Sequence, residues 1–469
     1  QLLNTAQTQT GEETLSAWLR APADRVEITD RQEAVRDLSP RVTLRERLAT
    51  LVAAKTHAAV HPAALAAWGN TAPVLHGVWP RVAALALSLL SVAAIIAWGR
   101  GAAGMLPLLS LAALAAFAVP FRKRTERVMR AADGPAYELA ILGQVCHVIR
   151  EGTYTSPRLA ALHAGLETTA GGAQQVVGKL QRLITLHDWQ HNILFAPIAA
   201  LLLWKLHCAF AVEAWRARHG WVVETWLRRV GEFEALSALA TYAYEHPADP
   251  FPELAETDGP PVYEAEALAH PLIPTTTAVA NDVALGASPQ VLIVSGSNMS
   301  GKTTLLRSIG VSAVLALMGA PVRAGRLRLS SVAIGATLRI EDSLQAGRSR
   351  FYAETIRLGQ IVTTARTHPT LFLFDELFHG TNSHDRTEGA RGLLRSLVYL
   401  NAIGLVTTHD LALAEIGEQL APKARNVHFD DTLVDGEMRF DFRLKAGPVT
   451  RSNALAIMRA VGLDLPDDD

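Results

Sequence analysis

The chain has 469 residues, a formal net charge of −1 and two cysteines, Cys146 and Cys208. The length allows two or three domains, and the near-zero net charge excludes a global basic field that would attract nucleic acid. Two cysteines exclude a disulfide framework and are typical of a reducing compartment. The chain begins at Gln1, without a charged-then-apolar signal peptide, and we expect a fragment of a longer protein.

Residues 1–80 are predicted to form the first part of a helical core domain. Apolar residues recur at helical spacing over 14–20 and 30–38, and Pro22 and Pro40 interrupt the pattern.

Two uncharged apolar runs follow, at residues 82–98 and 102–119. Each would span about 25 Å as a helix, near the lower limit for crossing a bilayer core. Arg81 precedes the pair and the basic run 122–124 follows it, which places both outer ends on the cytoplasmic side of an inner membrane. We expect a transmembrane hairpin over residues 81–124, and the alternative is a buried helical hairpin in a soluble core.

Residues 125–246 are predicted to form the second part of the helical core, or a lever. They contain a third apolar run, 193–212, which carries Lys205 and His207. A third crossing would separate the flanking segments across the membrane, so we interpret this run as a core or interfacial helix. Elsewhere, apolar residues at helical spacing predict two packed faces; these residues are Leu139, Leu142, Cys146 and Ile149 on one, and Val230, Phe233, Leu236 and Leu239 on the other.

The pattern changes after a proline-rich, acidic linker at residues 247–262. Short apolar runs at 291–295, 371–374 and 402–407 alternate with helical stretches. This alternation predicts an α/β domain with a parallel sheet over residues 263–469.

Residues 296–303 fit the phosphate-binding loop pattern G-x-x-x-x-G-K-[ST], between a β-branched run and a helical run. Backbone N–H groups of such a loop point at phosphates, and the following helix adds its positive N-terminal end. Lys302 would reach the β- and γ-phosphates of ATP, and the Thr303 hydroxyl would hold Mg²⁺. The alternative is a chance glycine turn. The predicted nucleotide-binding residues are Gly296, Ser297, Asn298, Met299, Ser300, Gly301, Lys302, Thr303 and Thr304.

An apolar strand at residues 371–374 ends in two acids, Asp375 and Glu376, which is a Walker B pattern. Asp375 would hold Mg²⁺, and Glu376 would activate the attacking water. His409 follows another β-run, where it could hydrogen-bond the γ-phosphate or that water. We therefore expect Lys302, Glu376 and His409 to be catalytic. The alternatives are an acid pair that closes a strand and a structural histidine.

Three segments of the predicted α/β domain resemble the ATPase domain of the MutS mismatch-repair family: 295–304 (SGSNMSGKTT), 375–385 (DELFHGTNSHD) and 407–411 (TTHDL). The Asn298-Met299 pair and the Asp-Glu-Leu…Gly-Thr string are its specific parts. Residues 342–351 with Glu354 are similar to the family's signature segment, and residues 424–428 and 447–456 to the end of its domain. The resemblance covers residues 263–469 and extends more weakly to 14–38 and 232–244.

The resemblance implies a P-loop ATPase of the ABC/MutS type that works as a homodimer through its ATPase domains. Ser349 of one subunit would contact the γ-phosphate bound by the other; the alternative is a local turn residue. Arg350 stands where the family has a small hydroxyl residue. The family has two aromatic side chains that stack on adenine. The first, which precedes an Asn-Asp pair, is missing here, because Ala280 and its neighbours precede Asn281. Phe442 matches the second.

The membrane hairpin makes the arrangement similar to membrane-associated MutS-like proteins. The family implies mismatched or branched DNA as substrate, although the mismatch-reading domain has no counterpart here and no basic stripe marks a nucleic-acid surface. The first alternative is a membrane-anchored, ATP-dependent switch for protein partners. The second, a transporter-type ATPase subunit, would carry a Leu-Ser-Gly-Gly-Gln-like string that this sequence lacks.

Overall fold

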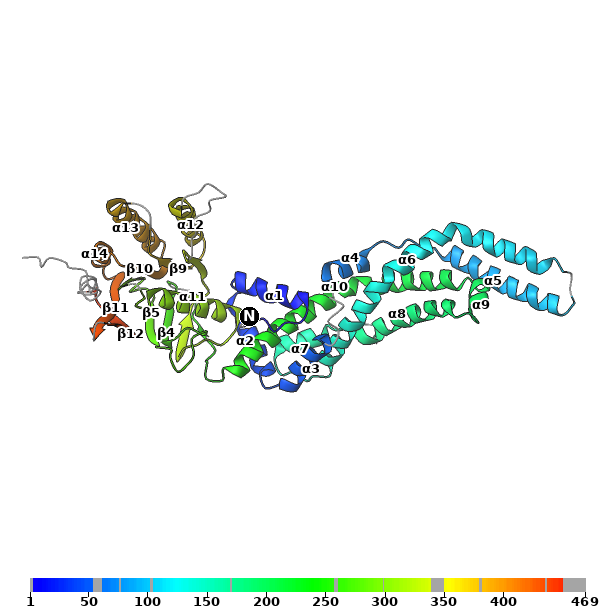
Figure 1. Ribbon diagram of the computed structural model, residues 1–469, viewed down its shortest axis with the longest axis horizontal. Helices are drawn as coiled ribbons and strands as arrows, with labels where there is room; N and C mark the ends of the chain where they lie inside the picture. Colours follow the sequence, from blue (N-terminus) through cyan, green and yellow to red (C-terminus); the bar gives the residue numbers. More distant parts are fainter. Residues whose placement is uncertain are drawn as a thin grey trace, which may run out of the picture. The chain divides into compact units, whose positions relative to one another are not determined.

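The computed structural model describes residues 3–53, 61–75, 77–101, 104–168, 171–256, 260–297, 299–338, 350–378, 382–434 and 437–449. The chain divides into two compact units. The first comprises Gln1–Ser16 and Asp37–Ala238, and the second comprises Ala17–Arg36 and Leu239–Asp469. Figure 1 shows the helices of the first unit and the two sheets of the second.

The first unit is helical, as the sequence predicts. Its elements are the start of α1 (Gln9–Arg20), then α3 (Val42–Ala53), α4 (Pro62–Asn70), α5 (Val78–Gly99), α6 (Leu106–Arg150), α7 (Pro157–Ala164), β1 (Glu167–Thr168), β2 (Gly171–Gly172), α8 (Ala173–Asp188), η1 (Trp189–His191), α9 (Ala196–Leu201) and most of α10 (Trp204–Glu245).

The two predicted apolar faces are buried. Every residue of the stripe on α6 and of the stripe on α10 lies in the core. A buried carboxylate lies among these helices: Glu234 Oε2 accepts hydrogen bonds from Thr8 N at 3.1 Å and Thr8 Oγ1 at 2.5 Å. Burial raises the pKa of Glu234, and the bonds from Thr8 oppose that shift.

The predicted hairpin consists of α5 and the first part of α6, which lie side by side (Figure 1). Both helices are long and apolar enough to cross a membrane by length and composition, a test that buried core helices also pass. Only 17% and 6% of their most apolar windows are buried, however, unlike core helices. The second helix does not end near residue 124, since α6 continues through Pro120 and Pro135 to Arg150.

The expectation of one helix over residues 193–212 was wrong. The chain forms α9 and the start of α10 there instead, and Leu203 separates the two with a positive φ of 46°. Ile193 and Leu194, between η1 and α9, are 88% and 86% exposed.

The second unit contains a six-stranded sheet with the order β12-β11-β6-β10-β9-β8. All neighbours in it are parallel except β11 and β12. The strands are β6 (Val291–Ser295), β8 (Ala333–Ala336), β9 (Thr370–Asp375), β10 (Ile403–Thr408), β11 (Ala424–Val434) and β12 (Glu437–Ala446). A four-stranded sheet has the order β3-β7-β4-β5, from β3 (Glu253–Leu254), β4 (Tyr263–Leu268), β5 (Asn281–Leu285) and β7 (Arg326–Leu329).

Helices cover both faces of the larger sheet, which explains why its central strands are continuous apolar runs. One face packs on α12 (Arg350–Ala365), α13 (Ser383–Tyr399) and α14 (Leu411–Gln419), and its core includes Phe372, Phe374 and Leu394. The helix α11 (Lys302–Met318) contacts β8, β9 and β10 through the other face. The helix α2 (Arg25–Leu38) also belongs largely to this unit. The α/β expectation is confirmed.

Candidate active site

Three neighbouring parallel strands bring the predicted site residues to one edge of the sheet. In register, Ser295 of β6 lies opposite Thr408 of β10, and Thr407 lies opposite Asp375 of β9. The glycine-rich loop, the acid pair and His409 therefore follow strands that end at the same level. The carboxyl ends of such strands are the usual binding edge of an open α/β sheet.

The loop after β6 needs glycine at both of its ends. Gly296 and Gly301 have positive φ angles of 151° and 109°. A Cβ on Gly296 would lie 2.9 Å from Ser300 Oγ and 3.0 Å from Phe429 O. A side chain at either glycine would strain the backbone, and at Gly296 it would also collide with neighbouring atoms.

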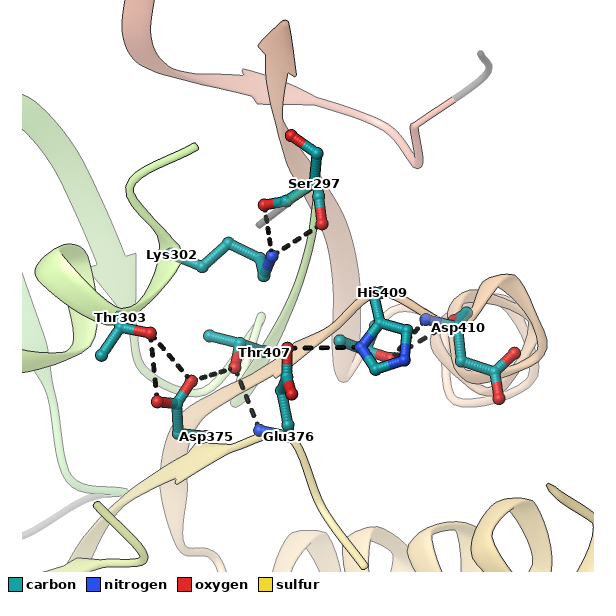
Figure 2. Close-up of polar contacts among 10 residues, drawn as sticks. Ser297, Lys302, Thr303, Asp375, Glu376, Thr407, His409 and Asp410 are labelled. Carbon is teal, nitrogen blue, oxygen red and sulfur yellow. Dashed lines mark hydrogen bonds and ion pairs between the residues drawn. The ribbon is translucent and has the colours of Figure 1, made fainter. Parts of the chain in front are cut away.

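Lys302 begins α11 and reaches back into this loop (Figure 2). Its Nζ donates to Gly296 O at 2.7 Å and to Ser297 O at 2.6 Å. The side chain is 4% exposed. Burial lowers the pKa of Lys302, and the charges of Glu376 and Asp375 oppose that shift. A buried ammonium with carboxylates nearby is well placed to contact phosphate oxygens at the start of the helix.

Two further polar atoms of the loop fit a phosphate ligand. Within the part of the chain that the structure describes, the hydroxyl oxygens of Ser297 and Ser300 are buried and have no hydrogen-bond partner. Buried hydroxyls are usually paired, so these groups are suited to bind a polar ligand. Met299, also predicted as a site residue, has a φ of 69° and an exposed side chain.

Asp375 is held from two sides by hydroxyl groups (Figure 2). Thr303 Oγ1 donates to its two carboxylate oxygens at 3.2 and 3.1 Å. Thr407 Oγ1 donates to Asp375 Oδ1 at 2.7 Å, and Thr337 Oγ1 accepts from the Asp375 backbone N–H at 3.2 Å. A hydroxyl and a carboxylate this close are hard oxygen donors of the kind that Mg²⁺ prefers, so Thr303 and Asp375 fit a Mg²⁺ ion bound with a nucleotide.

Glu376 and His409 form the second polar pair of the site (Figure 2). His409 Nδ1 lies 3.2 Å from Glu376 Oε1, and the Glu376 backbone N–H donates to Thr407 Oγ1 at 3.2 Å. Glu376 has a positive φ of 49°. Such strained backbone persists where the surrounding structure enforces it, as at functional sites, and here Thr407 bonds to both neighbouring acids.

Phe442 lines a cavity of about 230 Å³ beside the start of α11. Its ring is close to the loop, because a Cβ on Gly301 would lie 3.3 Å from Phe442 Cδ1. Asn281 fixes this part of β12, since its side chain donates to Phe442 O at 2.9 Å and accepts from Leu444 N at 2.7 Å. Thr304, from the predicted list, and Ala278 also line the cavity.

Two of the predicted site residues, Asn298 and Ser349, lie outside the described residues. Three further residues of the site were not predicted from the sequence: Thr407 and Thr337, which hold the acids, and Asn281, which holds the strand of Phe442. Thr407 stands two residues before His409 at a strand end, a position that could have marked it. Thr337 has no comparable signal, because its contact depends on the pairing of β8 with β9.

This geometry defines a P-loop nucleotide site with a Walker B acid pair. Residues 292–467 match the family model of MutS domain V, which is an ABC-type ATPase domain. The chain is also similar to the DNA mismatch repair protein MutS 2 of Halobacterium salinarum, with 31% identity over 249 residues. That match covers 51% of this chain, and it spans 27% of the relative's length. Residues 292–467 are thus similar to the ATP-binding domain of MutS proteins.

Proposed function

We propose that the chain is a membrane-anchored, dimeric ATPase that hydrolyses ATP to ADP and phosphate at this site. The observation that carries the proposal is the arrangement of Glu376 and His409 beside an Asp375 carboxylate that Thr303 and Thr407 hold.

In the proposed reaction, the loop and Lys302 bind the β- and γ-phosphates. Glu376 orients the attacking water and accepts its proton, and His409 holds the Glu376 carboxylate in position through the contact at 3.2 Å. Mg²⁺, held by Thr303 and Asp375, would neutralise charge on the phosphate oxygens. Phe442 would stack on the adenine in its cavity, and Ser349 of a second subunit would complete the site.

The membrane part of the proposal rests on α5 and the first part of α6. Their apolar surface is open to solvent within the first unit. Soluble proteins seldom expose so large an apolar surface. We propose that this hairpin lies in the inner membrane, with the ATPase domain on the cytoplasmic side. The experiment is alkaline carbonate extraction of membranes that contain the full chain; release into the soluble fraction would contradict the anchor.

Two partners are candidates for the ATP cycle. The matched relative is named as a DNA mismatch repair protein, which supports mismatched or branched DNA as the partner. The exposed hairpin favours a second candidate, an ATP-dependent switch for protein partners at the membrane.

Phosphate release by the detergent-solubilised full chain separates the two candidates. It is measured alone and with duplex, mismatched or branched DNA, over a series of salt concentrations. Turnover that responds to DNA, with an effect that weakens as salt rises, supports the DNA role. Equal turnover with all four samples supports the switch. The Lys302→Ala variant is the control for contaminating ATPases.

A further inference from the structure

An apolar segment lies beside the base of the hairpin, in the same helical unit. The segment comprises η1, α9, the link between them and the two residues after α9, and we name it the 189–203 segment. Aromatic contacts connect it to α10, since the Phe195 ring meets those of Trp189 and Trp204 edge-on and Trp204 Nε1 donates to Leu186 O at 2.6 Å. Several of its large apolar side chains nevertheless point to solvent: Trp189, Ile193, Leu194 and Ile198.

A cavity of about 530 Å³ separates α9 from α6. Its apolar lining includes Ala115 and Ala118 from α6 and Ala199 and Ala200 from α9, together with larger side chains such as Phe121, Leu203 and Trp204. Its polar lining includes Arg122, Glu126, Gln190 and Lys205. The cavity therefore combines an apolar wall with a charged end, which suits an amphipathic ligand.

The charged end of the cavity is basic. Glu126 is shared among three cations, at 3.6 Å from Arg122, 3.8 Å from Arg130 and 3.9 Å from Lys205. These separations exceed the usual hydrogen-bond length, so the cations retain donors for another anion. Residues 122–130 include one acid and a larger set of exposed bases: Arg122, Lys123, Arg124, Arg127 and Arg130. A basic cluster directly after an apolar helix is typical of contact with anionic lipids.

The cavity and the basic cluster lie at the level where a membrane surface would cross the hairpin. Ala115 and Arg122 are seven positions apart on α6, which is about 10 Å along a helix. This is the depth to which interfacial helices bury their apolar side chains. With Arg122 among the headgroups, α9 would lie in the outer part of the acyl layer, and Trp189 would lie near the interface, where tryptophan is common.

We infer that this cavity binds one anionic phospholipid of the cytoplasmic leaflet, with its phosphate between Arg122 and Lys205 and its acyl chains against the apolar lining. The 189–203 segment is then a third membrane-contacting element, which does not cross the bilayer. The inference rests on the proposed membrane anchor and specifies which lipid class the anchor selects.

The test measures lipid retained by the full chain in detergent micelles after gel filtration, with dioleoyl phosphatidylglycerol or dioleoyl phosphatidylcholine added. The wild-type chain should retain about tenfold more of the anionic lipid, and Arg122→Ala/Lys205→Ala should lose that preference. The double variant Lys123→Ala/Arg124→Ala is the matched control, because it removes the same charge from residues that do not line the cavity. It should retain the anionic lipid within about twofold of the wild type.

Equal retention of both lipids by the wild type would overturn the inference, and so would equal losses in the two double variants, which would indicate diffuse attraction alone. Ala118→Trp keeps every charge and fills the cavity, so this variant should also lose the anionic lipid. If it retains as much anionic lipid as the wild type, the lipid does not bind in the cavity and the inference is overturned. Carbonate extraction tests the anchor separately. A carbonate-resistant chain without lipid preference overturns the cavity alone, whereas an extractable chain that prefers the anionic lipid overturns only the anchor.

Discussion

Thr407→Val should slow ATP hydrolysis without weakening ATP binding. The substitution keeps the shape of a fully buried side chain and removes its hydroxyl. That hydroxyl donates to Asp375 Oδ1 at 2.7 Å and accepts from the Glu376 N–H at 3.2 Å. Both acids therefore lose a contact that fixes them, while Lys302 and the glycine-rich loop keep their bonds.

The expected size of the effect follows from the charged bond. A hydrogen bond to an ionised group contributes about 1.5–3 kcal/mol, and about 1.4 kcal/mol of barrier changes a rate tenfold. If this stabilisation acts in the transition state, kcat falls by about 10- to 150-fold. The Mg²⁺ concentration for half-maximal turnover should also rise, because Asp375 is less firmly held.

Steady-state phosphate release over ATP and Mg²⁺ series gives both quantities, and nucleotide binding is measured in parallel. Thr407→Ser keeps the hydroxyl and should stay close to wild type, which separates positioning from packing. The reasoning is refuted if folded Thr407→Val has a kcat within twofold of wild type and an unchanged Mg²⁺ dependence.

Three further substitutions have expected outcomes. Lys302→Ala should raise the Kd for ATP by about 10- to 150-fold in equilibrium binding, since it removes a charged donor to phosphate worth about 1.5–3 kcal/mol; a Kd within threefold would contradict this role. Phe442→Ala should raise the Kd for ATP by about 5- to 150-fold, because stacking on a base is worth about 1–3 kcal/mol, and it should leave inorganic triphosphate binding unchanged. Burial raises the folded-state pKa of Glu234, so the contribution of this group to stability is fully present below its unfolded pKa and is lost as pH rises through its folded pKa. Glu234→Gln cannot ionise and does not lose this stability, so the Tm of the variant relative to wild type should increase with pH. A Tm difference that does not change with pH would contradict a raised pKa for Glu234.

The strands that carry the candidate site could be predicted from the sequence to within a residue. The runs 291–295, 371–374 and 402–407 correspond to β6, β9 and β10, because strands buried on both faces are continuous apolar runs. The order of motifs along these strands then brings the phosphate loop, the acid pair and His409 to one edge. These are the features that depend on local sequence.

The contacts that hold the site could not be predicted in this way. Thr337, Thr407 and Asn281 act through partners from other elements, and their bonds arise only when the strands pair. The break at Leu203 was missed for a related reason. The hydropathy of residues 193–212 shows only that the segment is apolar. It cannot show a turn that tertiary contacts stabilise.

Glu376→Gln is the sharpest test of the hydrolytic site, because it removes the proposed base and keeps the size of the side chain. Turnover and ATP binding are measured on the detergent-solubilised full chain for the variant and the wild type. The structure predicts ATP binding within about threefold of wild type and turnover reduced by at least about a hundredfold, as expected for loss of a general base. Unchanged turnover in Glu376→Gln would contradict the assignment of Glu376 and the hydrolytic site built around it.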